Sequence, residues 1–163
     1  ITTAYHSWVF DEPKNIVVLP YTSMHGSTRR MVEYLVEALS QRGVTVQQFD
    51  MATTDVGKLA MALVEAATVV IGTPTVLAGP HPNVVTAVFL ANALRPKLRF
   101  ASIIGSYGWG GKTVEILSGM IPNLKVEVLE PVLIKGLPKE ADFKALDNLA
   151  ATIAAKHKEN NFK

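Results

Sequence analysis

Hydrophobic positions follow two different spacings along this chain, and the two spacings alternate five times. Short runs that are mostly apolar predict strands buried on both faces of a sheet. Longer stretches, in which apolar residues recur every three or four positions, predict amphipathic helices. The predicted strands are residues 15–20, 44–50, 67–72, 99–105 and 125–134. The predicted helices are residues 28–42, 56–66, 83–94, 112–120 and 140–157. This alternation predicts an α/β protein whose five-stranded parallel sheet lies between two layers of helices.

Several of the predicted elements carry signals at their ends. Gly43 follows the first helix, as a C-cap glycine does, and Asp55 is an N-cap candidate for the second. Pro131 falls inside the last predicted strand and indicates a break or a sheet edge there. Residues 73–82 contain three prolines and a glycine, which predicts a loop without regular structure.

Composition narrows the classes of protein that the chain can represent. It has 163 residues, of which 48% are hydrophobic and 18% charged, as expected for one packed domain. A net charge of +2 without a clustered basic face argues against nucleic-acid binding. The absence of cysteine excludes disulfides, thiolate metal sites and iron–sulfur clusters. No apolar run approaches the roughly 20 residues that span a bilayer, and the N-terminus lacks signal-peptide order. We therefore expect a cytoplasmic protein that does not bind a membrane.

Residues 1–14 precede the first predicted strand and contain three aromatic side chains, Tyr5, Trp8 and Phe10. A disordered tail would be poor in aromatic residues, so this segment is expected to pack against protein. We interpret it as a linker between domains, with residues 15–163 forming the domain itself. The alternative is a short arm that packs on its own domain.

Three unusual loops follow the first, third and fourth predicted strands. In the doubly wound strand order 2-1-3-4-5 these strands are neighbours, so the three loops converge on one crevice at the carboxyl ends of the strands. Ligands of open α/β sheets bind at such a place. The convergence predicts one binding site built from all three loops.

The first loop, residues 19–30, offers serine and threonine hydroxyls and backbone N–H groups around Gly26, directly before a helix. That arrangement suits a phosphate, because the helix dipole favours an anion there. The loop lacks the lysine of a nucleoside-triphosphate P-loop and the G-x-G-x-x-G pattern of a dinucleotide site. A phosphate monoester fits it better, although many turns of this composition are simple helix caps.

The other two loops are suited to a flat ligand. Four glycines surround Tyr107 and Trp109 in the third loop, so the backbone can approach a ligand closely and an aromatic ring can stack on it. The second loop offers apolar Val76 and Leu77 as an opposite wall. Alternatively, Trp109 only covers the hydrophobic core. A phosphate joined to a planar, partly apolar ring describes flavin mononucleotide (FMN).

The loop sequences strengthen this interpretation. Ser-Met-His-Gly-Ser-Thr at 23–28 resembles the phosphate loop of flavodoxins, Thr/Ser-x-x-Gly-x-Thr, and residues 73–75 and 106–111 resemble their two ring-binding loops. The sequences of these loops, together with the preceding Tyr-x-x-Trp segment, are most similar to the flavodoxin domain of flavodiiron proteins. The resemblance implies a flavodoxin-like fold and FMN as cofactor. It places FMN contacts at Ser23, Met24, His25, Gly26, Ser27, Thr28, Thr73, Pro74, Thr75, Val76, Leu77, Ala78, Ser106, Tyr107, Gly108, Trp109, Gly110 and Gly111.

The resemblance also implies a partner. Flavodiiron proteins join this domain to a metallo-β-lactamase-like domain with two irons, which reduces O₂ to water or NO to N₂O. The FMN passes electrons from a donor, such as rubredoxin, a reductase or reduced F420, to the diiron site of the same protein. In a head-to-tail homo-oligomer that site belongs to the partner subunit.

The iron-binding motif of that family, His-x-Glu-x-Asp-His, is missing from this sequence. The four histidines, His6, His25, His81 and His157, are scattered and are expected at the surface or in loops rather than on a metal. We therefore expect no metal site and no catalytic residue in the chain, which would be the electron-carrying domain of a larger enzyme.

Two alternatives remain. One is a stand-alone flavodoxin-like NAD(P)H:quinone or FMN reductase, which a hydride-transfer assay would reveal. The other is a receiver-type signalling module. That module needs acidic residues after the first strand and an aspartate after the third, where this chain has Pro20-Tyr21 and Gly72-Thr73-Pro74. The receiver interpretation is therefore disfavoured.

Overall fold

Parallel strands form the centre of the computed structural model, which describes residues 13–24, 26–76, 79–94, 97–107, 113–121 and 125–163. The strands are β1 (Lys14–Tyr21), β2 (Thr45–Asp50), β3 (Ala66–Val76), β4 (Gly79–Pro80), β5 (Phe100–Tyr107), β6 (Glu127–Val128) and β7 (Val132–Lys135). Their order is β2-β1-β3-β5-β6, with β7 also paired to β5 and β4 to β3. Among the described residues every strand pair is parallel except β3–β4. The predicted order 2-1-3-4-5 is confirmed, since β6 and β7 share the fifth place.

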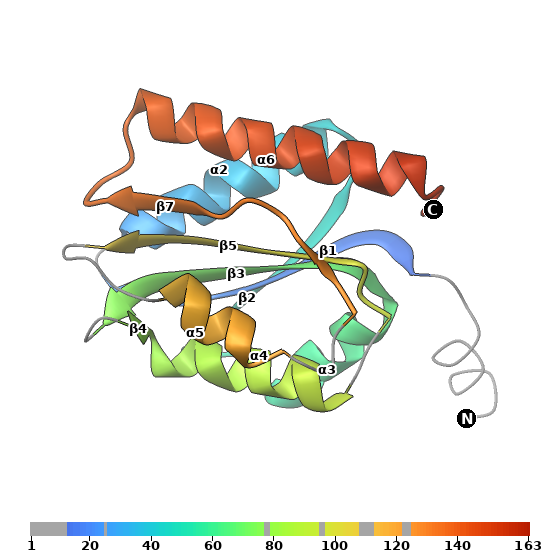
Figure 1. The fold of residues 1–163 in the computed structure, drawn as a ribbon, viewed down its shortest axis with the longest axis horizontal. Helices are drawn as coiled ribbons and strands as arrows, with labels where there is room; N and C mark the ends of the chain where they lie inside the picture. Colours follow the sequence, from blue (N-terminus) through green and yellow to red (C-terminus); the bar gives the residue numbers. More distant parts are fainter. Residues whose placement is uncertain (1–12, 25, 77–78, 95–96, 108–112, 122–124) are drawn as a thin grey trace.

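Helices cover both faces of the sheet, as predicted. They are α2 (Ser27–Gln41), α3 (Val56–Glu65), α4 (Pro82–Leu94), α5 (Thr113–Gly119) and α6 (Glu140–Glu159). Figure 1 shows α2 and α6 on one face and α3, α4 and α5 on the other. None of the helices within the described part of the chain is long and apolar enough to cross a membrane.

Two separate hydrophobic clusters fill the layers on either side of the sheet. In the first, Leu19 and Val17 of β1 pack with Leu35 of α2 and Ile153 of α6. In the second, Val18 of β1 packs with residues of α3 and α4. Because alternate residues of β1 enter opposite clusters, both faces of the strand are buried. This explains why its sequence is a continuous apolar run.

The ends of several elements match their sequence signals. Gly43 has a φ of 80°, a left-handed conformation that ends α2, and Asp55 accepts a hydrogen bond from Gly57 N at 2.9 Å at the start of α3. The fifth strand is interrupted between β6 and β7, where Pro131 lies. Lys14 belongs to β1 and pairs with Ala66, so the strand begins earlier than predicted.

The prediction of an irregular loop at 73–82 was wrong. Strand β3 continues through Pro74 to Val76, and β4 pairs back on it. Proline is tolerated there because β1 ends at Tyr21, opposite Gly72, so β3 has only β5 beside it at Pro74. The fourth predicted strand is also longer, because Ser106 and Tyr107 belong to β5.

The prediction that His157 lies at the surface was wrong as well. Its side chain is only 2% exposed, on the inner face of α6. Its ring nitrogens contact Thr68 Oγ1 at 2.6 Å and Asn15 Oδ1 at 2.8 Å, at the amino ends of β3 and β1. His157 therefore ties the C-terminal helix to the end of the sheet opposite the predicted site.

Candidate functional site

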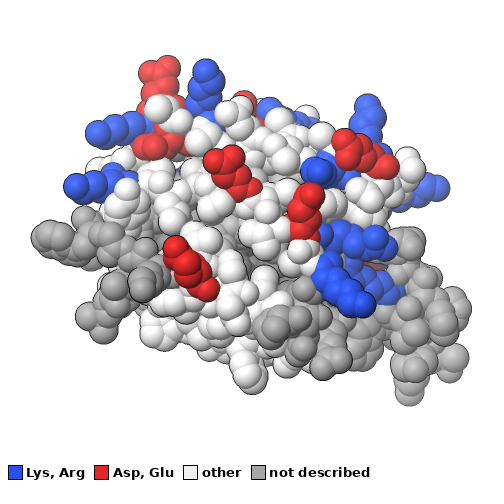
Figure 2. Space-filling model, in the orientation of Figure 1, with Lys and Arg blue, Asp and Glu red and all other residues white. Residues whose placement is uncertain are grey.

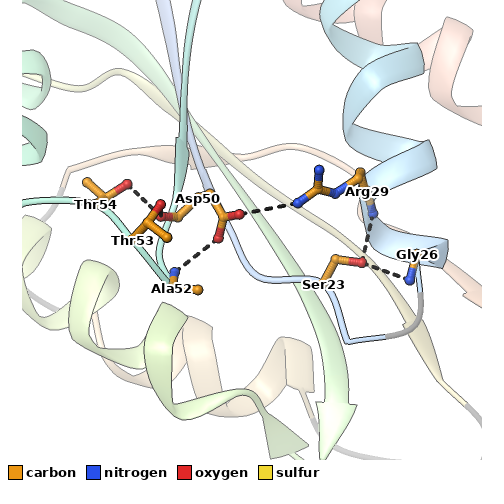
Figure 3. A network of polar contacts seen from close by, with 7 residues as sticks. All are labelled: Ser23, Gly26, Arg29, Asp50, Ala52, Thr53 and Thr54. Atoms are coloured by element: carbon orange, nitrogen blue, oxygen red, sulfur yellow. Dashed lines mark hydrogen bonds and ion pairs between the residues drawn. The ribbon is translucent and has the colours of Figure 1, made fainter.

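The loop after β1 is a tight turn organised by one hydroxyl group. Ser23 Oγ accepts hydrogen bonds from the backbone N–H groups of Gly26 and Arg29, at 3.1 and 3.2 Å (Figure 3). A serine hydroxyl can still donate its own proton while it accepts these bonds. Ser23 therefore shapes the loop and offers a donor to a bound anion.

Gly26 is the residue at which the turn passes into α2. Its φ of 87° is left-handed, a conformation that glycine adopts without strain. Ser27 and Thr28 begin the helix, so their backbone N–H groups lie at the positive end of its dipole and lack intrahelical acceptors. The loop is thus built as an anion site, as its sequence predicts.

A charged pair borders this loop. Arg29 Nη2 lies 3.3 Å from Asp50 Oδ2, at the end of β2 (Figure 3). The other carboxylate oxygen of Asp50 accepts a hydrogen bond from Ala52 N at 3.0 Å, and its carbonyl accepts one from Thr54 Oγ1 at 2.6 Å. Burial raises the pKa of the Tyr21 phenol, and the negative charge of Asp50 adds to the rise. The positive charge of Arg29 is partly neutralised by Asp50, which also organises the turn after β2.

The ends of β3 and β5 lie beside the loop and are joined to it by hydroxyl groups. Thr28 Oγ1 is 3.3 Å from Ser106 Oγ, which links the first and third loops. Thr75 Oγ1 is 3.1 Å from Thr113 Oγ1, which links the second loop to the start of α5. These two contacts bring the three predicted loops together at one edge of the sheet.

The second loop is fixed by Thr73, which is 1% exposed. Its hydroxyl donates to Pro74 O at 2.8 Å and accepts from His81 N at 2.9 Å. Opposite Thr73, Gly105 of β5 lies so close that a Cβ there would overlap the Thr73 carbonyl oxygen. Strands β3 and β5 therefore end in a closely packed wall.

One buried hydroxyl near the loop has no partner. Thr22 is 4% exposed, and its Oγ1 is the only buried side-chain nitrogen or oxygen without a hydrogen bond among the described residues. The Oγ1 atom is closed off from solvent, so it faces the protein interior and not an open crevice. The hydroxyls and N–H groups of the site are the donor set that a phosphate ester requires.

The structure thus brings together most of the predicted site residues that it describes. Ser23, Gly26, Ser27, Thr28, Thr73, Pro74, Thr75, Ser106 and Tyr107 lie in the first loop or at the ends of β3 and β5. Met24 is 53% exposed, and Val76 ends β3. The predictions for His25, Leu77, Ala78, Gly108, Trp109, Gly110 and Gly111 lie outside the described residues and stay predictions.

Two residues of the site were not singled out in the sequence. Asp50 ends the strand beside the first loop, and Thr113 begins the helix after the third loop. Both follow from one signal, since polar residues near the carboxyl edge of a doubly wound sheet lie close to the ligand crevice. Within the described segments, no group of three or more His, Cys, Asp or Glu residues could hold a metal ion.

A doubly wound sheet with a phosphate loop after β1 and two further loops beside it defines the class of α/β proteins that bind a nucleotide cofactor at the strand switch point. A family model described as Flavodoxin matches residues 19–146, so the chain belongs to the flavodoxin family. This confirms the predicted fold class and FMN as the cofactor.

Longer proteins contain a similar domain. A rubredoxin-oxygen oxidoreductase of Megalodesulfovibrio gigas is 29% identical over 92% of this chain and 38% of its own length. A nitric oxide reductase of Moorella thermoacetica is 29% identical over 96% and 40%. The solved rubredoxin oxygen:oxidoreductase of Desulfovibrio gigas superposes with a TM-score of 0.89, at 29% identity, over 95% of this chain and 39% of that one. The chain therefore spans about two fifths of the length of the relatives that it matches.

Proposed function

We propose that this chain is the FMN-bearing, electron-transferring part of a larger flavodiiron reductase of O₂ or NO. The observation that carries the proposal is the Thr28–Ser106 contact at 3.3 Å, because it joins the phosphate loop to a ring-binding loop in a single site. The relatives' names support the type of enzyme, and their greater length supports a further domain.

When it is bound, FMN supplies the redox chemistry, and the protein supplies binding, orientation and electrostatics. Ser23, Ser27, Thr28 and the backbone N–H groups at the start of α2 would hold the phosphate. The ends of β3 and β5 would place the ring and exclude water from one side of it. We assign no catalytic acid or base to the chain, because the redox chemistry is that of the flavin.

The surface of the chain supports a protein partner beside the site. Helix α4, which follows the second loop, contains no charged residue, and Phe89 on it is 67% exposed. Figure 2 shows that the described surface over α4 and α5 is mostly uncharged, whereas charged side chains gather over α6. An uncharged helix surface that exposes an aromatic side chain supports a protein contact there.

We propose the diiron domain of the same protein, in the same or a partner subunit of a homo-oligomer, as the electron acceptor. A rubredoxin, a reductase or reduced F420 is proposed as the donor. The names of relatives that include rubredoxin and coenzyme F420H₂ support these two donors. The linker role of residues 1–14 and the cytoplasmic location stay predictions.

Titration with FMN tests the proposed function, and a pair of glycine variants tests the site. The wild-type chain should bind one FMN with quenched flavin fluorescence. Gly26→Ala should weaken binding about tenfold, because a Cβ at φ 87° strains the turn by roughly 1–2 kcal/mol. Gly43→Ala is the matched control: its φ is 80°, its Cβ also meets open space, and it lies at the other end of α2.

Gly43→Ala should lower stability as much as Gly26→Ala and leave the dissociation constant for FMN unchanged. A wild-type chain that neither binds FMN nor quenches its fluorescence would overturn the proposed function. Equal loss of affinity in both variants would show that the turn at Gly26 is not part of the site. Rapid oxidation of NADH with a quinone by the loaded chain would favour the reductase alternative.

The Arg29–Asp50 pair gives a prediction with a defined sign. Asp50→Asn should tighten FMN binding about threefold at low salt, because it removes a negative charge beside the phosphate loop and frees Arg29 from its partner. Stability should change by less than about 0.5 kcal/mol, since the pair is partly exposed and asparagine can keep the Ala52 contact.

Dissociation constants measured at low and high salt check this prediction. The gain should shrink as salt rises, because the interaction is screened. Glu37→Gln, two turns further along α2, removes the same charge and should leave the affinity unchanged. Weaker binding in Asp50→Asn would show that Asp50 acts through the shape of the loop and not through its charge.

A further inference from the structure

The imidazole ring of His81 caps the N-terminus of α4, which begins at the next residue. The Nδ1 atom of the ring accepts a hydrogen bond from Asn83 N at 3.1 Å. The carbonyl oxygen of the same residue accepts the first bonds of the helix, from Val84 N at 3.1 Å and Val85 N at 3.3 Å. This is the geometry of an N-cap, but serine, threonine, aspartate and asparagine are the residues that favour the position. Unlike those of serine, threonine and asparagine, this cap can take up a proton near neutral pH.

His81 also holds the second loop. Its backbone N–H donates to Thr73 Oγ1 at 2.9 Å, and that hydroxyl in turn donates to Pro74 O at 2.8 Å. Thr75, two residues further along β3, is tied to the start of α5 through the Thr113 hydroxyl at 3.1 Å. His81 therefore joins the start of α4 to the end of the strand from which the second loop departs.

Few charged groups surround this cap. Helix α4 contains no charged residue, and the sequences of β3 and β4 contain none either. Helix α5, which packs against β4, carries Glu115 in its first turn. Helix α3, which packs against α4, carries Lys58 and Glu65, and Glu65 is already paired with Lys14. The first turn of α4 thus has no carboxylate that would compensate a positive charge on the His81 ring.

Protonation would reverse the role of the ring. A neutral imidazole has one nitrogen that accepts a hydrogen bond, whereas both nitrogens of the charged ring donate. A proton on Nδ1 would therefore bring two donors together, the ring and Asn83 N. It would also place a positive charge at the positive end of the helix dipole, where a cation is unfavourable. His81 is partly exposed, so solvent can supply that proton.

We propose that His81 is a proton-sensitive positioning residue, whose neutral ring caps α4 and fixes the second loop and whose protonation releases both. Histidine side chains ordinarily change charge between pH 5 and pH 8, so the effect is to be measured in this range. The consequence for FMN rests on the proposed function, in which the second loop is one wall of the cofactor site. Mild acid should then weaken FMN binding through the cap.

Nuclear magnetic resonance of the chain without FMN tests the cap itself. The protection of the Asn83 amide against hydrogen exchange should fall about fivefold from pH 8 to pH 5, as expected for the loss of one capping bond. His81→Asn is the matched variant, because asparagine is a good N-cap residue whose side chain does not titrate. In this variant the protection of Asn83 should be the same at both pH values.

Titration with FMN at the same two pH values measures the effect on the cofactor site. The dissociation constant should rise about fivefold more in the wild type than in His81→Asn. A phosphate ester also changes charge in this range, but both chains bind the same ligand, so the comparison removes that contribution. His81→Ala has no capping side chain at any pH and should bind FMN about fivefold more weakly than the wild type at pH 8.

Protection of Asn83 that does not change with pH in the wild type overturns the proposal. Equal pH dependence of FMN affinity in the wild type and in His81→Asn also overturns it, because the second loop would then not depend on the cap. Failure of the wild-type chain to bind FMN is a different result. It rejects the proposed function, while the exchange experiment still decides whether His81 is a proton-sensitive cap.

Discussion

Gly105→Ala is expected to destabilise the chain by about 3 kcal/mol or more, a large fraction of the roughly 5–15 kcal/mol by which a domain is typically stable. Gly105 lies in β5, in register with Thr73 of β3. A Cβ at this position would overlap the backbone carbonyl oxygen of Thr73. Because the obstacle is backbone and not the end of a side chain, no rotamer change can relieve the overlap.

The consequences should reach the FMN site as well as stability. Separating β3 from β5 would move Thr73 and Thr75 away from Ser106, and so would widen the wall beside the phosphate loop. Urea denaturation followed by circular dichroism measures the loss of stability. If the variant stays folded, FMN titration should show binding weaker than that of the wild type.

Gly119→Ala is the matched control for this prediction. Gly119 ends α5, and a Cβ there would meet open space. The same substitution should therefore be neutral or slightly stabilising, since alanine favours the helix. A Gly105→Ala chain as stable as the Gly119→Ala chain would show that β3 and β5 can separate without cost, and would contradict the packing described above.

The sequence was sufficient to predict the elements whose signals are local. The apolar run of β1, the positive φ at Gly43 and the break at Pro131 each depend on residues within a few positions of one another. The convergence of the first, third and fourth loops also followed, because the strand order alone brings those strand ends together.

What the sequence did not predict depends on contacts between distant segments. Strand β3 passes through Pro74 only because β1 has already ended beside it. Likewise, the exposure of His157 could not be inferred from its place in a charged helix end, because Thr68 and Asn15 come from the other end of the chain.

His157 leads to the second large expected effect, which is a loss of stability in mild acid. Burial lowers the pKa of its imidazole from 6.5 to about 4 in the folded chain. Below pH 6.5 the unfolded chain therefore takes up a proton that the folded chain does not. Between pH 6.5 and pH 4 the free energy of unfolding should fall by about 2 to 3 kcal/mol from this residue.

The hydrogen bonds of His157 explain why protonation is also unfavourable geometrically. Asn15 Nδ2 donates to Gly43 O at 3.0 Å, so Asn15 Oδ1 is left as an acceptor for His157 Nδ1–H. His157 Nε2 is then the unprotonated nitrogen and accepts a bond from Thr68 Oγ1 at 2.6 Å. A second proton on the ring would turn Nε2 from an acceptor into a donor and break this bond. The neighbouring Phe100 and Phe162 rings carry no negative charge that would stabilise the charged imidazole.

Comparison of His157→Gln with the wild type isolates this contribution from that of the carboxylates, which also titrate in acid. The variant should be less stable at pH 7, because it cannot span Thr68 and Asn15 as an imidazole does, but its stability should vary less between pH 6.5 and pH 4. Urea denaturation at half-unit pH steps measures both chains. If the free energy of unfolding varies equally with pH in the wild type and in His157→Gln, the folded chain accepts a proton at His157 as easily as the unfolded chain does. That result would contradict the role of His157 as the acid-sensitive contact between α6 and the sheet.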